Sequence, residues 1–174
     1  RAADNAVAFK MTVNTIASRN GLYASFDPKP LKGESGNGMH VNMAAQDGNG
    51  GDHTPSFMAG IMAHIKGITA FLNPTDSSYA RLGEKKAPKY ISWSPENRSQ
   101  LIRIPAAKGD YKRIELRSPD SGTNPYIAFA LLIEAGLDGI EKNMQPCEPT
   151  NLDLYKASEE TLKADIQSFL ICVH

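Results

Sequence analysis

Apolar residues recur every three or four positions in several long stretches of the chain, which is the spacing of a helix with one buried face. These stretches cover residues 4–20, 54–72, 124–142 and 158–170. The second begins with Thr54 and Pro55, so Thr54 is expected to be the N-cap and Pro55 the first helical residue. The pattern therefore predicts four helices.

Short segments between these helices have the composition or the alternating pattern of strands. They cover residues 22–26, 39–43, 90–93, 101–105 and 111–117. Their connections are short and hairpin-like, and strand and helix do not alternate regularly. This order favours an α+β fold with a mainly antiparallel sheet.

Three of the predicted strands combine a buried side with an ionisable side. A two-residue period places Ile114 and Leu116 on one face of their strand and the polar residues on the other. The polar positions found in this way are His40, Asn42, Arg103, Arg113, Glu115 and Arg117.

Two interpretations of this polar face remain open. It can be the wet side of a sheet, on which arginine and glutamate simply pair. Alternatively it can be a binding site, because arginine forks bind carboxylate or phosphate oxygens while glutamate and histidine bind divalent cations. The second interpretation implies an anionic, metal-bound substrate.

Loops offer further candidate groups. Arg98 is expected in the turn between two strands, and Arg81 in a loop after residues 73–80. Each of them can also be an ordinary solvated arginine. The backbone of Gly36-Asn37-Gly38 can cradle an anion, although this short motif is weak evidence. Lys85, Lys86 and Lys89 suggest a mobile solvated loop.

The composition narrows the class of protein. The 174 residues suit a single domain of ordinary size, and 19 basic residues balance 19 acidic ones. The zero net charge argues against a general electrostatic affinity for nucleic acid or anionic membranes. Two cysteines without CxxC spacing point to a reducing cytoplasm. With neither an initiator Met nor a signal peptide, the chain is expected to be a piece of a longer protein.

Five motifs, taken together, resemble the catalytic domain of glutamine synthetase in order and spacing. They lie at residues 35–40, 73–82, 97–105, 113–120 and 124–126. The resemblance covers residues 2–143, so we expect a glutamine synthetase-like catalytic domain over residues 1–143. Residues 144–174 are then a linker and a C-terminal helical segment. The implied fold is a curved, mainly antiparallel sheet backed by helices, with its concave polar face forming the site.

The resemblance implies that the full-length protein makes glutamine from glutamate, ammonia and ATP through γ-glutamyl phosphate, with Mg²⁺ or Mn²⁺. Its residue roles carry over position by position. His40 and Glu115 match metal ligands; Gly36, Arg81 and Arg117 match groups that bind glutamate. Asn42, Arg103 and Arg113 match ATP contacts, and Arg98 matches the arginine set against the transferred phosphoryl group.

The chain departs from the family pattern at several positions. Ser35 stands where the family usually has Asn, and Asn42 stands where it commonly has His. The flap after Arg81 is one residue shorter, which places the family's catalytic glutamate on Lys86 or, with another gap, on Glu84. The family's N-terminal domain, which completes the site of a neighbouring subunit in a homo-oligomer and supplies most metal ligands, is not in this chain. We therefore expect the isolated chain to be nearly inactive.

Two other functions remain open. A ligase that joins glutamate to a larger amine, such as a polyamine, needs the same ATP and glutamate groups and differs only at the amine pocket. A non-catalytic relative is expected to have lost arginines or metal ligands, and this chain retains them. A nucleic-acid-binding module fits less well, because the net charge is zero and basic and aromatic residues do not alternate.

Overall fold

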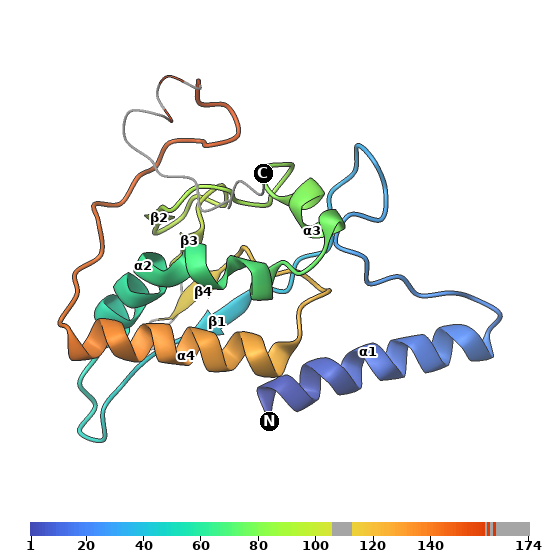
Figure 1. Cartoon of the computed structure of the whole chain (residues 1–174), viewed down its shortest axis with the longest axis horizontal. Coiled ribbons are helices and arrows are strands. Elements are labelled where there is room, and N and C mark those ends of the chain that lie inside the picture. Colours follow the sequence, from blue (N-terminus) through green and yellow to red (C-terminus); the bar gives the residue numbers. More distant parts are fainter. Residues whose placement is uncertain (106–112, 159, 161, 163–174) are drawn as a thin grey trace.

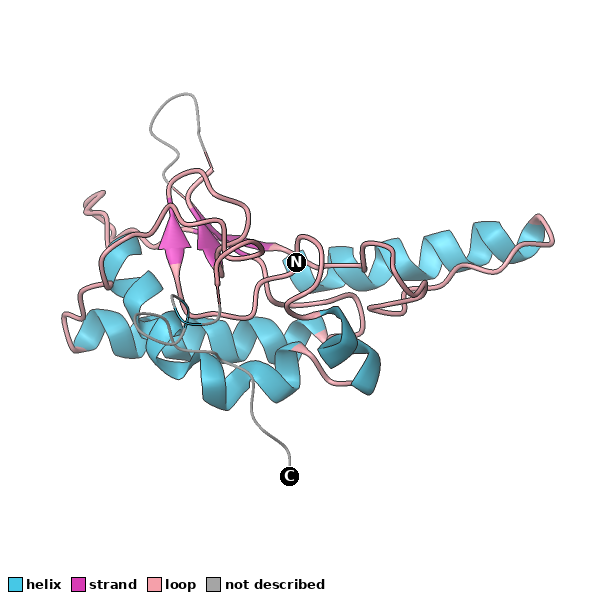
Figure 2. Cartoon of the chain, turned by 90° about the horizontal axis from the view of Figure 1, so that it is seen from above, coloured by secondary structure: helices cyan, strands magenta, loops and turns pink. Residues whose placement is uncertain are grey.

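The computed structural model describes residues 1–105, 113–158, 160 and 162. Its helices are α1 (Ala2–Arg19), α2 (Thr54–Leu72), α3 (Asp76–Arg81) and α4 (Pro125–Glu141). Its strands are β1 (Val41–Met43), β2 (Trp93–Ser94), β3 (Ile102–Arg103) and β4 (Ile114–Leu116). Helices α2 and α4 lie side by side and cover one face of the sheet, while α1 extends away from them (Figures 1 and 2).

The strands form one sheet in the order β1-β4-β3-β2. Strand β4 is antiparallel to both of its neighbours, whereas β2 and β3 run parallel. The expectation of an α+β fold with a mainly antiparallel sheet is therefore confirmed. Because β4 lies inside the sheet, the side chains of its two neighbours can meet those of β4 on the same face.

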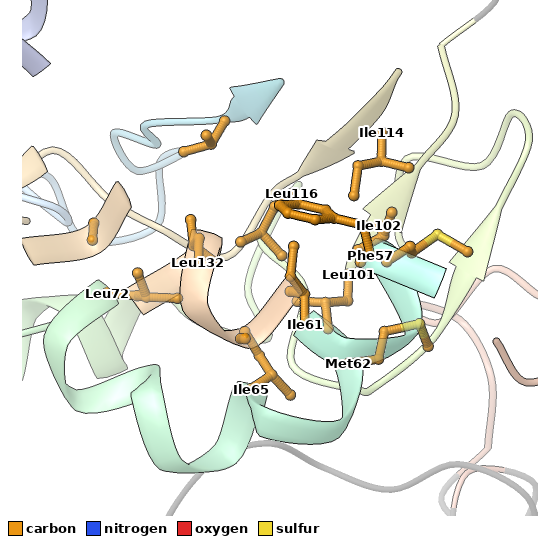
Figure 3. Close-up of a cluster of buried hydrophobic side chains, with 14 of the residues drawn as sticks. Phe57, Ile61, Met62, Ile65, Leu72, Leu101, Ile102, Ile114, Leu116 and Leu132 are labelled. Carbon is orange, nitrogen blue, oxygen red and sulfur yellow. The ribbon is translucent and has the colours of Figure 1, made fainter. Parts of the chain in front are cut away.

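The hydrophobic core lies between the sheet and the helix pair (Figure 3). Ile61 and Ile65 from α2 and Leu132 from α4 are fully buried beside Ile102 and Leu116 from the strands. Each such side chain contributes about 1.5–3 kcal/mol by leaving water. This core holds the sheet on the helices, so the opposite face of the sheet is left for other groups.

Two glycines let α2 and α4 approach closely. A Cβ atom added to Gly60 would lie 2.2 Å from the Ala135 carbonyl oxygen, and one added to Gly139 would lie 2.2 Å from the Ser56 carbonyl oxygen. Real Cβ atoms do not come this near to backbone, so any larger residue would force the helices apart.

Most of the elements expected from the sequence are present. The helix expected at residues 124–142 is α4, and the Asn124 side chain caps it by accepting hydrogen bonds from the N–H groups of Tyr126 and Ile127. The helix expected at residues 4–20 is α1, but its apolar face is not covered. Phe9 and Ile16 remain 62% and 56% exposed. The helix expected at residues 158–170 lies almost wholly outside the described residues.

Three local predictions were wrong. Residues 22–26 form no strand, since Leu22 and Tyr23 are exposed and no strand among the described residues pairs with them. Thr54 is not the N-cap of α2: the N-cap is His53, and the Thr54 hydroxyl instead accepts a hydrogen bond of 3.1 Å from the Ala45 N–H. Arg81 lies not in a loop but at the end of α3, whose first turn is held by a capping box between Thr75 and Ser78.

Helix α1 is joined by hydrogen bonds to the start of α4 and to the segment before it. The Tyr126 hydroxyl donates a hydrogen bond of 2.7 Å to Asp4, and the Lys10 ammonium donates one to the Ser121 carbonyl. Of the helices that the structure describes, none combines the length and the apolar character that crossing a membrane requires.

Candidate functional site

The polar face of the sheet carries a row of side chains across three neighbouring strands. In the strand register, Asn42 of β1 and Arg103 of β3 both stand opposite Glu115 of β4. Paired residues project to the same face, so these three side chains meet on the side away from the core. They form part of the wall of a cavity of about 510 Å³.

All of the expected site residues except Arg113 line this cavity. They are Gly36, His40, Asn42, Arg81, Arg98, Arg103, Glu115 and Arg117. The folded chain thus brings together groups from β1, α3, β3 and β4 and from three connecting segments. Arg113 is exposed beside the cavity, where its Nε donates a hydrogen bond of 3.1 Å to Asn42.

Glu115 is at the centre of the polar contacts. Its Oε2 lies 2.5 Å from Nη2 of Arg103, and its Oε1 lies 2.6 Å from Nη1 of Arg117. Burial favours a raised pKa for Glu115, but the hydrogen bonds from the two arginines outweigh it and leave the pKa lowered. At neutral pH the carboxylate is ionised although it is only 6% exposed.

The contacts on this face support the pairing interpretation in part, and the binding interpretation stays a prediction. Glu115 pairs with two arginines, as a simple salt-bridged face requires. However, the centre of this face is shielded from water, while His40 and Asn42 at its edge are exposed. Each residue of β4 is buried, and the guanidinium of Arg117 is itself only 5% exposed. A recessed, arginine-rich wall of this kind is suited to an anionic ligand.

His40 contacts the same carboxylate, with Nδ1 3.1 Å from Oε1 of Glu115. Burial and the positive charge of Arg117 lower the pKa of His40, and they prevail over the opposite effect of Glu115. The imidazole is therefore neutral at pH 7, so this contact is not an ion pair. A neutral imidazole keeps a lone pair for a cation.

Arg81 is held rigidly at the edge of the cavity. Its Nη1 donates to the Ser118 carbonyl at 2.8 Å and its Nη2 to the Arg117 carbonyl at 3.2 Å. Burial lowers the pKa of Arg81, but a guanidinium remains charged throughout the physiological range. The short helix α3 thus presents a fixed positive charge.

The glycine loop lies directly against this arginine. A Cβ atom on Gly38 would lie 2.8 Å from Nη2 of Arg81 and 3.1 Å from Nε2 of His40. A Cβ atom on Gly36 would lie 2.3 Å from the Pro28 carbonyl oxygen. At Gly36 only glycine fits, because the obstructing atom belongs to the backbone. At Gly38 an added Cβ would press on the side chains of Arg81 and His40, so glycine leaves these two side chains undisturbed.

The flap contributes two residues that sequence reasoning assigned to a mobile solvated loop. Lys85 and Lys86 are exposed, yet both line the cavity, and the Lys86 carbonyl accepts a hydrogen bond of 3.2 Å from Nη2 of Arg117. Glu84 does not line the cavity; its carboxylate lies 3.6 Å from the ammonium of Lys29. The sequence signal for Lys86 was the family resemblance, which places the catalytic glutamate of the flap at Lys86 or at Glu84.

The residues of the cavity include two side chains of the types that bind divalent metal ions. His40 and Glu115 lie side by side and offer an imidazole nitrogen and a carboxylate, both usual ligands for a divalent cation. Within residues 1–105, 113–158, 160 and 162, no three His, Cys, Asp or Glu residues come together to hold a metal. The described residues can therefore supply two ligands to a divalent metal ion.

These features define an α+β domain with an arginine-lined cavity in which an imidazole and a carboxylate lie side by side. The family model "Glutamine synthetase, catalytic domain" matches residues 1–170. The glutamine synthetase of Methanosarcina mazei is 47% identical over 171 residues, which cover 91% of this chain and 38% of that protein. That of Clostridium saccharobutylicum is 44% identical and covers 92% of this chain and 39% of the relative.

Solved structures agree with the sequence relatives. One described as "Apo GmaS without ligand" has a TM-score of 0.78 at 36% identity and covers 88% of this chain and 38% of that one. Another, "GmaS/ADP complex-Conformation 1", has a TM-score of 0.82 at 34% identity and covers 95% and 41%. The chain belongs to the glutamine synthetase family, with the fold of its catalytic domain. It spans about two fifths of the length of these relatives.

Proposed function

We propose that the full-length protein joins ammonia to the γ-carboxylate of glutamate with ATP, through γ-glutamyl phosphate, and so forms glutamine. The observation that carries the proposal is the cavity in which Arg81, Arg98, Arg103 and Arg117 surround the His40–Glu115 pair. Membership of the glutamine synthetase family supports the same reaction. The reaction needs charge neutralisation at several phosphate and carboxylate oxygens, which these arginines provide.

Each group has a role in this proposal. Arg81 and Arg117 bind the carboxylates of glutamate, and the backbone of Gly36 contacts the same substrate. Arg103 and Arg113 bind the phosphates of ATP, and Asn42, which Arg113 contacts, faces the nucleotide. A related structure, the "GmaS/ADP complex-Conformation 1", supports a nucleotide site in this fold.

Arg98 acts on the reacting group itself. In-line transfer of the γ-phosphoryl group spreads negative charge over its oxygens, and a fixed guanidinium lowers the energy of that arrangement. The γ-carboxylate of glutamate attacks, ADP leaves, and ammonia then displaces phosphate from the acyl phosphate. The residues of this chain position the substrates and neutralise the charge on the phosphoryl group. The covalent changes occur between the substrates.

His40 and Glu115 would hold a divalent cation, Mg²⁺ or Mn²⁺. When bound, this cation supplies positive charge to the phosphate oxygens. Because two protein ligands hold Mg²⁺ only weakly, further ligands must come from parts of the full-length protein outside this chain. We therefore propose that the isolated chain is nearly inactive and that the parent works as a cytoplasmic homo-oligomer whose subunits share their sites.

A larger amine in place of ammonia is the second candidate. Ser35 and Lys86 line the cavity at positions where the family pattern has other residues, and two solved relatives carry the name GmaS rather than glutamine synthetase. A ligase of this second type would use the same arginines and differ in the pocket for the acceptor.

The test is ADP release by the full-length protein with ATP, Mg²⁺ and glutamate, with ammonia compared against a panel of amines. Arg98→Ala is expected to lower kcat by about 10²–10³-fold, as the loss of one group that stabilises transition-state charge does. Arg19→Ala, at the exposed end of α1, is the matched control. Turnover only with larger amines would favour the second candidate, and no turnover with any amine would indicate a non-catalytic relative.

A further inference from the structure

We propose that Asn97 is a positioning residue for Arg98, because it ties the turn between β2 and β3 to the segment formed by residues 150–155. This inference rests on the proposed function, in which Arg98 faces the transferred phosphoryl group. Asn97 itself does not line the cavity. Its contribution is to the backbone from which Arg98 projects.

Arg98 depends on its backbone for its position. Its side chain is exposed, and within the described residues it makes no ion pair that would orient it. Arg103 and Arg117, by contrast, are each held by Glu115. A long side chain with no partner is placed only as accurately as the turn that carries it, so the turn itself must be rigid.

Both the nitrogen and the oxygen of the Asn97 side-chain amide form hydrogen bonds. Its Nδ2 donates hydrogen bonds of 2.9 Å to the carbonyl oxygens of Asn151 and Leu152. Its Oδ1 accepts hydrogen bonds of 2.9 Å from the N–H and the hydroxyl of Ser99. One side chain thus closes the turn around Arg98 and also fastens it to a segment more than fifty residues away in sequence.

Neighbouring residues complete the attachment on both sides of Arg98. The Ser94 hydroxyl donates to Oδ1 of Asn151 at 2.6 Å, and Nε2 of Gln100 donates to the Leu152 carbonyl at 2.8 Å. The N–H of Leu154 donates to the Ser99 hydroxyl at 3.0 Å. Ser94, Ser99 and Gln100 are at most 2% exposed, so these bonds are protected from competition with water.

Residues 147–150 continue the attachment along β2. The indole N–H of Trp93 donates to the Cys147 carbonyl at 2.6 Å, and the N–H of Thr150 donates to the Trp93 carbonyl at 3.0 Å. Residues 147–154 therefore lie along β2, the edge strand of the sheet, and are hydrogen-bonded to the turn that follows β2. Asn97 and Ser99, the residues on either side of Arg98, each join the turn to this segment by two side-chain hydrogen bonds.

The test compares Asn97→Asp with wild type in the full-length protein. This change keeps the size of the side chain and its acceptor for Ser99, but it removes both donors and sets a carboxylate against two carbonyl oxygens. Amide hydrogen exchange at Thr150 and Leu154, whose N–H groups bond to β2 and to the turn, is expected to become at least about tenfold faster. The kcat is expected to fall by about 10- to 100-fold while the KM for glutamate changes by less than about threefold.

Asn49→Asp is the matched control, since Asn49 is exposed in the glycine-rich turn far from this contact in sequence. It is expected to change neither exchange nor kcat. Asn151→Ala, which removes the acceptor for Ser94, provides a second variant with the same expected direction. Circular dichroism confirms that each variant is folded before kinetics are measured.

The outcomes are distinguishable. Faster exchange together with a lower kcat supports the proposal. Unchanged exchange at Thr150 and Leu154 would overturn the anchoring, and faster exchange with an unchanged kcat would overturn the positioning role. A wild-type protein that ligates no amine would overturn the proposed function and, with it, the role of Asn97 in turnover; the exchange data would still report the contact.

Discussion

Arg117 binds the carboxylate of Glu115, two residues earlier in the chain, with Nη1 2.6 Å from Oε1. Side chains two apart on a strand face the same way, so β4 and the residue after it place the negative and the positive group together. Arg103 binds the other oxygen from the neighbouring strand. One carboxylate therefore organises two of the four arginines of the cavity.

Replacement of this carboxylate should destabilise the protein. Glu115→Gln leaves the buried guanidinium of Arg117 without its counter-charge, which typically costs about 3–5 kcal/mol. We expect a lower urea midpoint and, in the full-length protein, weaker Mn²⁺ binding measured by titration calorimetry. Glu96→Gln, at an exposed position, is the control. Equal midpoints for the two variants would contradict a structural role for the Glu115 charge.

The contact between α2 and α4 should not tolerate an added methyl group. Gly139→Ala would set Cβ 2.2 Å from the Ser56 carbonyl oxygen, and we expect a loss of about 1–3 kcal/mol in the free energy of unfolding. Gly67→Ala lies in α2 with nothing within 4 Å of its Cβ, and it should be neutral or stabilising by up to about 1 kcal/mol. Thermal denaturation of both variants measures the difference, and similar losses in both would show that the close approach is unimportant.

Gly38→Ala should disturb the site more than the fold. The added Cβ would meet Nη2 of Arg81 at 2.8 Å, and a side-chain end can move where backbone cannot. We expect the KM for glutamate to rise by about tenfold, while stability changes by less than about 1 kcal/mol. Gly48→Ala, with nothing within 4 Å of its Cβ, is the control. A normal KM in the Gly38 variant would argue against contact between Arg81 and glutamate.

Asp120 should make stability depend on pH. Burial raises its pKa, and the charge of Arg81 and the N–H of Gly122 offset only part of that effect. Because the folded pKa lies above the unfolded one, the folded state binds the proton more tightly. Its stabilising contribution is complete below the unfolded pKa, about 3.9, and is lost as pH rises through the folded pKa.

Asp120→Asn removes this titration and keeps an oxygen that can accept the Gly122 hydrogen bond. Its stability relative to wild type should therefore improve as the pH is raised through the folded pKa of Asp120. Urea midpoints of both proteins, measured at several pH values from acid to neutral, test the sign. A constant difference between the two would show that Asp120 does not titrate differently in the folded state.

Local patterns in the sequence predicted most elements and the composition of the site. The two-residue period assigned Glu115 to the face opposite Ile114 and Leu116, and the family motifs named eight of the residues that line the cavity. The same patterns failed at residues 22–26, where strand-like residues have no strand beside them in the part of the chain that the structure describes. They also failed at Arg81, because the capping box that forms α3 depends on two small polar residues, Thr75 and Ser78, in a segment expected to be a loop.

The sequence by itself determined which residues have a buried side and which have a charged side, because that property depends only on the local period of the backbone. Only the tertiary structure decided which charged sides meet. Asn42, Arg103 and Glu115 come into one row because β4 lies between β1 and β3. Likewise, Asn97 reaches residues 151 and 152 only because the chain returns along β2. Pairings of this kind are set by the packing of distant segments against one core, so no local pattern contains them.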